Sequence, residues 1–286
     1  MDQRIIDLYD EYTHAPLDRR VFLERLTRLA GGTAAAYALL PLLENNYALA
    51  QQVAPNDGRI VAERVSFAGA TGQVGGYLAR PADGAKAPAV IVIHENRGLN
   101  AHIEDVARRA AVAGFLALAP DMLSPLGGTP SDEDRAREMF GQLNAGDTVS
   151  NLRAAVAWLE RHSHSTGKVG AMGFCWGGGM VNALAVEEPE LDAGVAFYGR
   201  VPDIAKVGQI RARMMMHYAG NDERINEGIP AYEKALRDAG KTFEIHRYEG
   251  TQHAFHNDTS GARYDAAAAK LAWERTVAFL KAGLAA

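Results

Sequence analysis

The pattern of apolar and polar positions after residue 50 alternates between strand-like and helix-like segments. Two alternating runs, 60–67 and 73–80, flank Gly69-Ala70-Thr71-Gly72 and predict a β-hairpin. A continuous Val/Ile run at 88–94 is typical of a strand buried on both faces of a parallel sheet. Further strands are predicted at 115–119, 168–174, 193–198, 214–218 and 242–248, and helices at 103–113, 131–143, 147–161, 180–186, 229–239 and 264–282. This order predicts one α/β domain, with a doubly wound, mostly parallel sheet and helices on both faces.

Residues 1–50 differ from the rest of the chain. Arg19-Arg20 precedes an apolar run, a weakly apolar stretch covers 29–40, and Ala48-Leu49-Ala50 places small residues at the positions that a signal peptidase reads. This resembles a twin-arginine export signal, which would carry a folded enzyme to the periplasm. Glu24 and Glu44 favour the alternative, a cytoplasmic protein whose N-terminal amphipathic helical extension stays attached. The expected boundaries are therefore 1–50 for the signal or extension and 51–286 for the α/β domain.

Composition and charge exclude several classes of partner. The chain has 286 residues, of which 48% are hydrophobic, so it can bury a sizeable core. A net charge of −5 without a sustained basic run argues against nucleic acid as a partner. No apolar segment reaches the roughly 18 residues that span a bilayer, so stable membrane insertion is not expected. Cys175 is the single cysteine, which excludes an internal disulfide and a cysteine cluster for metal.

The segment 172–179, Met-Gly-Phe-Cys-Trp-Gly-Gly-Gly, lies between a predicted strand and a predicted helix. Gly-x-Cys-x-Gly in that context is the nucleophile elbow of the α/β-hydrolase fold, with a thiol in place of the usual hydroxyl. The turn is so tight that side chains at Gly173 and Gly177 would collide with the backbone. The N-terminus of the following helix favours a thiolate at Cys175. We therefore expect Cys175 to be a nucleophile.

A nucleophile at the elbow needs a base and an orienting acid, which follow it along the chain in this fold. Asp222 comes directly after a predicted strand and a Gly-Asn pair, and His253 lies in the loop after the last predicted strand. Both positions fall at the carboxyl ends of strands, where open α/β sheets place their sites. The sequence therefore predicts a Cys175–His253–Asp222 triad.

The loop His94-Glu95-Asn96-Arg97-Gly98-Leu99-Asn100 follows the first buried strand and occupies the place of the oxyanion loop. Backbone N–H groups of Asn96 and Trp176 are the candidate oxyanion donors. Glu95 is expected beside the thiol, where an idle carboxylate is costly, although a surface glutamate at a loop entry is the alternative.

These stretches together resemble the dienelactone hydrolase family, also called carboxymethylenebutenolidases, over about residues 60–286. The resemblance rests on 94–100, Lys168 to Gly178, Gly220-Asn221-Asp222 and Gln252-His253-Ala254-Phe255. It implies Cys175 as nucleophile, His253 as base and Asp222 as its orienter, without a cofactor or a metal. It also implies that Glu95 holds the resting thiol and takes part in forming the thiolate. The reaction implied is the opening of a dienelactone to a maleylacetate-type diacid through a thioester.

The chain departs from this family in one respect. Well-known members carry an arginine shortly after the catalytic histidine to bind the substrate carboxylate, and here the residues are His256-Asn257-Asp258. Arg200 and Arg97 are the alternative cations, with Arg135 and Arg137 as weaker candidates, and Tyr198 and His256 are expected to line the pocket. The expected partner is a small lactone or ester. The alternatives are a promiscuous carboxylesterase of the same fold and a non-catalytic binding protein. The sequence does not decide whether the protein is a monomer or a dimer.

Overall fold

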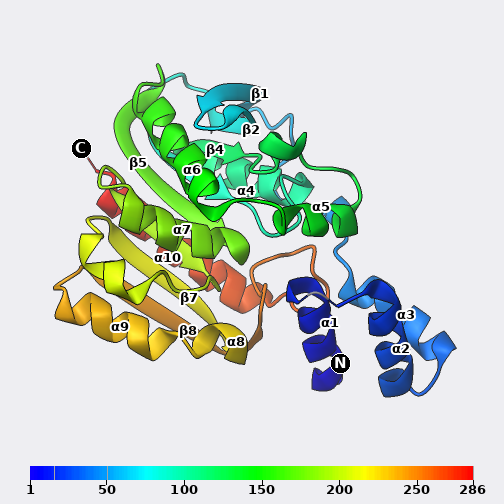
Figure 1. Cartoon of the computed structure of the whole chain (residues 1–286). Coiled ribbons are helices and arrows are strands. Elements are labelled where there is room, and N and C mark those ends of the chain that lie inside the picture. The colour runs from blue at the N-terminus through cyan, green and yellow to red at the C-terminus, as the bar shows by residue number, and fades with distance from the viewer. Residues whose placement is uncertain (16, 50, 286) are drawn as a thin grey trace.

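The computed structural model describes residues 1–15, 17–49 and 51–285, and Figure 1 shows its sheet with helices on both faces. Eight strands form the sheet in the order β1-β2-β4-β3-β5-β6-β7-β8. β1 and β2 are antiparallel to each other, β2 is antiparallel to β4, and the pairs from β4 to β8 are parallel. The prediction of a doubly wound, mostly parallel sheet is confirmed. The strands are β1 Ile60–Gly69, β2 Gly72–Pro81, β3 Ala87–Ile93, β4 Leu116–Pro120, β5 Ser165–Phe174, β6 Ala193–Phe197, β7 Arg213–Asn221 and β8 Phe243–Gln252.

Two hydrophobic cores lie on opposite faces of the sheet. In β3, Val90 and Val92 contribute to one core, and Ile91 and Ile93 contribute to the other, which explains the uninterrupted apolar run of this strand. α4 (Ala101–Val112) and α10 (Ala266–Gly283) cover the first face. α6 (Ala145–Glu160), α7 (Trp176–Glu187) and α9 (Ile229–Asp238) cover the second face.

Three strands extend three or more residues beyond their predicted ends. β5 begins at Ser165 rather than Lys168, β7 continues to Asn221 rather than ending at Tyr218, and β8 continues to Gln252 rather than ending at Tyr248. The extension of β8 pairs Asn221 with Gln252 after a register shift beyond Ala219. Such an irregularity in pairing leaves no trace in the alternation of apolar residues, so the sequence could not reveal it.

Shorter elements connect the strands at the carboxyl edge of the sheet. α5 (Glu133–Phe140) begins after Asp132, whose side chain accepts a hydrogen bond from the N–H of Arg135 and so caps the helix. The helix ends at Phe140, three residues before the predicted end. α8 (Glu223–Asn226) and the 3-10 turns η1 (Tyr47–Leu49), η2 (Ser124–Leu126) and η3 (Ile204–Gln209) were not predicted.

The N-terminal segment forms three helices with a hydrophobic cluster of their own: α1 (Gln3–His14), α2 (Arg19–Ala30) and α3 (Thr33–Leu43). α1 lies beside the body of the molecule in Figure 1, and its last residue, His14, contacts groups that follow β5 and β8. Among the described residues, no single helix is long and apolar enough to cross a membrane. The segments Arg19–Ala30 and Thr33–Leu49 reach the required length and apolar composition only when taken together, and the chain bends by 112° between them. Ala50, at the end of the expected cleavage motif, lies outside the described residues.

Candidate active site

Cys175 occupies a strained turn between β5 and α7. Its backbone has φ 55° and ψ −113°, a conformation that a non-glycine residue adopts only when its surroundings enforce it. A Cβ at Gly173 would lie 2.2 Å from the carbonyl oxygen of Gly177, and a Cβ at Gly177 would lie 2.3 Å from that of Ile93. Both glycines are therefore required by close backbone packing, as the sequence predicted.

The helix α7 begins directly after Cys175. Trp176 is the first residue of the helix, and N–H groups at this end have no acceptor within their own helix. The ring of Trp176 stacks on His94 with centroids 5.5 Å apart, which fixes this end of the helix against the loop after β3. The side-chain amide of Asn96, in that loop, donates to the carbonyl oxygen of Thr13 at 2.7 Å. Asn96 and Trp176 therefore lie on one wall of the site, where the oxyanion donors are expected.

His253 and Asp222 form a buried pair. Asp222 directly follows β7 and His253 directly follows β8, and Nδ1 of His253 lies 2.5 Å from Oδ2 of Asp222. Burial opposes the charged imidazole, but the negative charges of Asp222, Cys175 and Asp10 outweigh burial and raise the pKa of His253 to about 9. Nε2 of His253 has no hydrogen-bond partner among the described residues. This nitrogen is therefore available to a group in the cavity.

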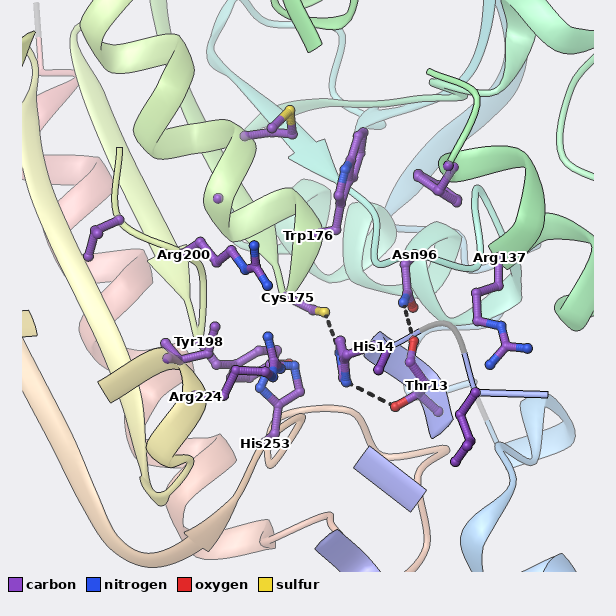
Figure 2. A pocket seen from close by; sticks show the side chains of 18 of the residues that line it. Thr13, His14, Asn96, Arg137, Cys175, Trp176, Tyr198, Arg200, Arg224 and His253 are labelled. Atoms are coloured by element: carbon purple, nitrogen blue, oxygen red, sulfur yellow. Dashed lines mark hydrogen bonds between the residues drawn. The ribbon is translucent and has the colours of Figure 1, made fainter. Parts of the chain in front are cut away.

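The thiol of Cys175 is hydrogen-bonded to a second histidine that the sequence did not suggest. Nε2 of His14, the last residue of α1, lies 3.1 Å from Sγ of Cys175. Figure 2 shows the His14 ring between the thiol and Thr13. The rings of His14 and His253 meet edge to face with centroids 4.5 Å apart. Two histidines from opposite ends of the chain thus converge on one sulfur atom.

Glu95 is buried behind the thiol. Asn257 donates to its Oε2 atom at 2.8 Å, whereas Oε1 has no hydrogen-bond partner among the described residues. Glu95 lines a small second cavity together with Cys175, His253 and His14. The resting partner of the thiol in this structure is His14 rather than Glu95.

A cavity of about 800 Å³ opens in front of Cys175 and is lined by both histidines. Three arginines line it: Arg137 from α5, Arg200 after β6 and Arg224 from α8. Arg224 lies 3.6 Å from Asp10, and Arg137 donates to the carbonyl oxygen of Tyr12. No carboxylate in the described part of the chain forms an ion pair with Arg200. Of the three arginines, its guanidinium is therefore the most available to bind an anionic group in the cavity.

The other residues expected at the pocket lie in different surroundings. Tyr198 lines the main cavity, with φ 38° and a buried hydroxyl that has no partner among the described residues. His256 is buried and stacks on Phe174, with centroids 5.1 Å apart, and it lines neither of the two cavities described here. Arg97 is buried beside the second cavity and pairs with Glu133 at 3.3 Å. Arg135 is exposed and pairs with Glu138 at 3.7 Å.

The ligand atoms of His14, Cys175 and His253 all lie within 4.8 Å of one another. Imidazole nitrogen and thiolate sulfur are ligands that zinc prefers. The same donor set also suits nucleophilic chemistry, in which a thiol needs nearby bases. The expectation that no metal takes part rested on the single cysteine and on the family resemblance, neither of which could detect a group formed by tertiary contact.

Sequence analysis missed three residues of the site. His14 lies in α1, within the segment expected to be an export signal or, alternatively, an attached helical extension. Arg224 lies in α8, which was not predicted, and Asn257 lies in the loop where an arginine was expected. One signal for α1 was present: Ile5, Leu8, Tyr9 and Tyr12 recur at helical spacing and are buried. An amphipathic pattern of this kind is atypical of an export signal, but it does not say what the helix packs against.

The fold and the site define an α/β-hydrolase with an elbow cysteine, and comparison with known proteins gives the family. The chain belongs to the dienelactone hydrolase family, whose model matches residues 74–284. A separate model described as YqhI-like matches residues 1–31. The chain is accordingly a hydrolase that acts on esters or lactones.

Individual relatives agree with this assignment. The chain is 54% identical over 112 residues to the provisionally named hydrolase fragment YghX of Escherichia coli K12, covering 38% of this chain and 96% of the fragment. It is 31% identical over 270 residues to a protein of Methylorubrum extorquens AM1 provisionally named a carboxymethylenebutenolidase, and the match covers 88% of this chain and 91% of that protein. The crystal structure of a provisionally named dienelactone hydrolase from Klebsiella pneumoniae superposes with a TM-score of 0.70 at 29% identity, covering 77% of this chain and 98% of that one.

Proposed function

We propose that the enzyme hydrolyses a lactone or small carboxylic ester through a thioester on Cys175, with His253 and Asp222 completing a triad. The observation that carries this proposal is the position of Cys175 in the strained elbow, beside a histidine whose Nδ1 atom lies 2.5 Å from a buried aspartate. A nucleophile, an acid–base group and an orienting carboxylate are the minimum set for acyl transfer.

In the first half-reaction the thiol of Cys175 gives its proton to a nearby base, the thiolate attacks the carbonyl carbon, and the bond to the leaving oxygen breaks. His253 is mostly protonated at neutral pH, because its pKa is raised to about 9, so its Nε2–H can donate a proton to that oxygen. In the second half-reaction the neutral His253 takes a proton from water while the water oxygen attacks the thioester, and the acid and the thiolate are released. The thiolate then recovers its proton from the base that took it. Asp222 keeps the Nδ1 proton of His253 in place throughout.

Backbone N–H groups of Asn96 and Trp176 would stabilise the oxyanion that forms in each half-reaction. The support for this role is their position on the wall beside the sulfur, at a loop after β3 and at the first residue of α7. Donors fixed before the reaction act most effectively in a buried site, where water does not compete.

The leading substrate is a dienelactone whose carboxylate is bound by Arg200. Arg200 lines the same cavity as Cys175, and a guanidinium binds a carboxylate with two parallel hydrogen bonds. Small uncharged esters are the second candidate. The absence of an arginine in 254–258, where well-known members of the family have one, favours that second candidate.

The proposal is tested by kcat/KM on dienelactone and on p-nitrophenyl acetate, with the wild type and Cys175→Ala. Loss of both activities in Cys175→Ala, with the fold retained, is the expected result, and a higher kcat/KM for the lactone in the wild type supports the charged substrate. A preference for the neutral ester would instead identify a general esterase with the same catalytic residues. Full activity of Cys175→Ala would contradict the thioester mechanism.

Glu95 is expected to assist ring opening in particular. Its carboxylate is buried beside the thiol and keeps one oxygen without a partner among the described residues, so it is available to a polar group of a bound lactone. Glu95→Gln should lower kcat/KM on dienelactone by about tenfold or more while p-nitrophenyl acetate is affected less. Equal losses on both substrates would refute the role in ring opening.

Export to the periplasm stays a prediction from Arg19-Arg20 and the small residues at 48–50. The alternative is a cytoplasmic enzyme that keeps these helices, and the packing of α1 against Cys175 supports it. The mass of the protein recovered from fractionated cells distinguishes them, because signal cleavage would produce a protein that begins near Gln51.

A further inference from the structure

We propose that His14 is a second base of the active site: it takes the thiol proton of Cys175, which makes helix α1 part of the catalytic centre. This inference rests on the proposed function, since it presumes that Cys175 is the nucleophile. It concerns a residue outside the family match, which begins at residue 74.

The first argument is contact with the reacting atom. Nε2 of His14 lies 3.1 Å from Sγ of Cys175, within the range of a hydrogen bond to sulfur, and the side chain of His14 is only 10% exposed. His253 contacts the ring of His14, but no hydrogen bond joins it to the sulfur within the described residues. The thiol in this structure is therefore hydrogen-bonded to His14.

The second argument is the tautomer of His14. Its Nδ1 atom lies 2.9 Å from the backbone carbonyl oxygen of Asp10, one turn earlier in α1. A carbonyl oxygen can only accept, so Nδ1 must carry a proton. In the neutral ring the lone pair is then on Nε2, which faces the sulfur. The geometry makes His14 the acceptor of the S–H proton and the thiol the donor.

The third argument is the charge around His14. The carboxylate of Asp10 lies 3.1 Å from Nδ1 and would stabilise the imidazolium that forms. Burial opposes ionisation of Asp10, but the positive charges of His253, His14 and Arg224 outweigh burial and hold the pKa of its carboxyl well below the usual range. The other charged or titratable groups that line the two cavities with His14 are Tyr9, Asp18, Glu95, Arg97, Arg137, Glu138, Cys175, Tyr198, Arg200, Arg224, His253 and Arg263.

The two histidines then divide the proton transfers. His14 breaks the S–H bond and keeps the proton while the thiolate attacks. His253, already protonated because its pKa is about 9, gives its proton to the leaving oxygen and then recovers one from water. When water has cleaved the thioester, the thiolate regains its proton from His14. The sum is one ester and one water converted to one acid and one alcohol, with both histidines restored.

The test is the pH dependence with which iodoacetamide alkylates Cys175 in full-length wild type, His14→Gln and His253→Gln. Glutamine keeps a polar atom near the sulfur but cannot take a proton. We expect half-maximal alkylation at a higher pH in His14→Gln, toward the ~8.5 of a free thiol. His253→Gln also removes a positive charge near the sulfur, and we expect a smaller upward shift there, because the thiol keeps His14 as its base. His164→Gln, remote from the site, is the matched control. An unchanged profile in His14→Gln would overturn the proposal.

A second measurement uses the burst of p-nitrophenol from p-nitrophenyl acetate. The leaving group needs no protonation, so the burst reports thiolate formation and attack. His14→Gln should slow the burst by about 10²-fold, whereas His253→Gln should keep the burst and accumulate acetyl-enzyme. A fast burst in His14→Gln, or its loss only in His253→Gln, would contradict the division of roles.

Folding and chemistry are separated by two further controls. His14→Asn keeps an amide N–H that can reach the carbonyl of Asp10, so it replaces His14→Gln if that variant does not reach the native circular dichroism spectrum. If Cys175 is not the nucleophile, no variant will give an acetylated Cys175 peptide, and the wild type will also lack it. That result identifies failure of the proposed function rather than of the role of His14.

Discussion

At the scale of single residues, the charge on His253 is the property on which the chemistry depends most. Asp222 lies 2.5 Å from its Nδ1 atom, and the pKa of about 9 means that the folded protein binds a proton that the unfolded chain releases at a lower pH. A group whose pKa is raised by folding stabilises the native state fully below its unfolded pKa. The stabilisation from His253 is therefore present below pH ~6.5 and is lost as the pH rises toward about 9.

Asp222→Asn is predicted to remove this pH dependence. The asparagine keeps a hydrogen bond to His253 but not the negative charge that raises its pKa. The free energy of unfolding by urea, measured at several pH values between about 6 and 9, should fall with pH in the wild type and be flatter in the variant. Parallel slopes in the two proteins would show that Asp222 does not hold the proton on His253.

Arg200 is the residue proposed to distinguish charged from neutral substrates, because it lines the same cavity as Cys175. A hydrogen bond to a charged group contributes about 1.5–3 kcal/mol, so Arg200→Ala should raise KM for dienelactone roughly ten- to a hundredfold and leave p-nitrophenyl acetate nearly unchanged. Arg135→Ala, on the exposed side of α5, is the matched control. If Arg200→Ala and Arg135→Ala behave alike, the carboxylate is bound elsewhere.

At the scale of elements, the strand–turn–helix unit around Cys175 depends on close backbone packing. Gly177→Ala would place a Cβ 2.3 Å from the carbonyl oxygen of Ile93, and neither backbone has room to move. We predict a loss of about 1–3 kcal/mol or more in stability, together with lost activity. Gly208→Ala is the control, because a Cβ there meets nothing within 4 Å. Equal melting temperatures for the two variants would refute this account of the elbow.

The elements show what the sequence could and could not predict. Local sequence patterns predicted the buried strands, such as β3, at the positions where the structure has them. They also predicted that Cys175, Asp222 and His253 lie at the ends of strands, as they do in the structure. His14 could not be placed, because its role depends on where α1 docks. That docking uses contacts between residues far apart in the sequence, such as Thr13 with Asn96, Tyr12 with Asp134 and His14 with Cys175. The Arg19-Arg20 pair led to the prediction of export. In the structure Arg19 forms ion pairs with Glu44 and Asp134.

At the scale of the whole molecule, the N-terminal helices form one wall of the substrate cavity. The residues of this segment that line the cavity are Thr13, His14, Ala15, Leu17 and Asp18. Arg25 with Glu11 ties α2 to α1, and Tyr12 donates to Asp134 of α5 at 2.7 Å. The segment is therefore joined to the hydrolase body at the mouth of the site.

Removal of residues 1–50 is predicted to broaden the substrate range. A protein that begins at Gln51 lacks this wall, so longer acyl chains can enter, whereas catalysis loses the contact between His14 and Cys175. The ratio of kcat/KM for p-nitrophenyl octanoate to that for the acetate should rise relative to the full chain. An unchanged ratio, with the native fold retained, would show that the N-terminal helices do not border the bound substrate.

The central claim is that acyl groups pass through Cys175, and trapping the intermediate tests it most directly. Full-length enzyme is mixed with p-nitrophenyl acetate, quenched in acid during turnover, digested and analysed by mass spectrometry. The account predicts one acetyl group on the peptide that carries Cys175, in larger amount in His253→Gln and absent in Cys175→Ala. Turnover without acetylation of that peptide in the wild type and in His253→Gln, or acetylation of another residue, would contradict it.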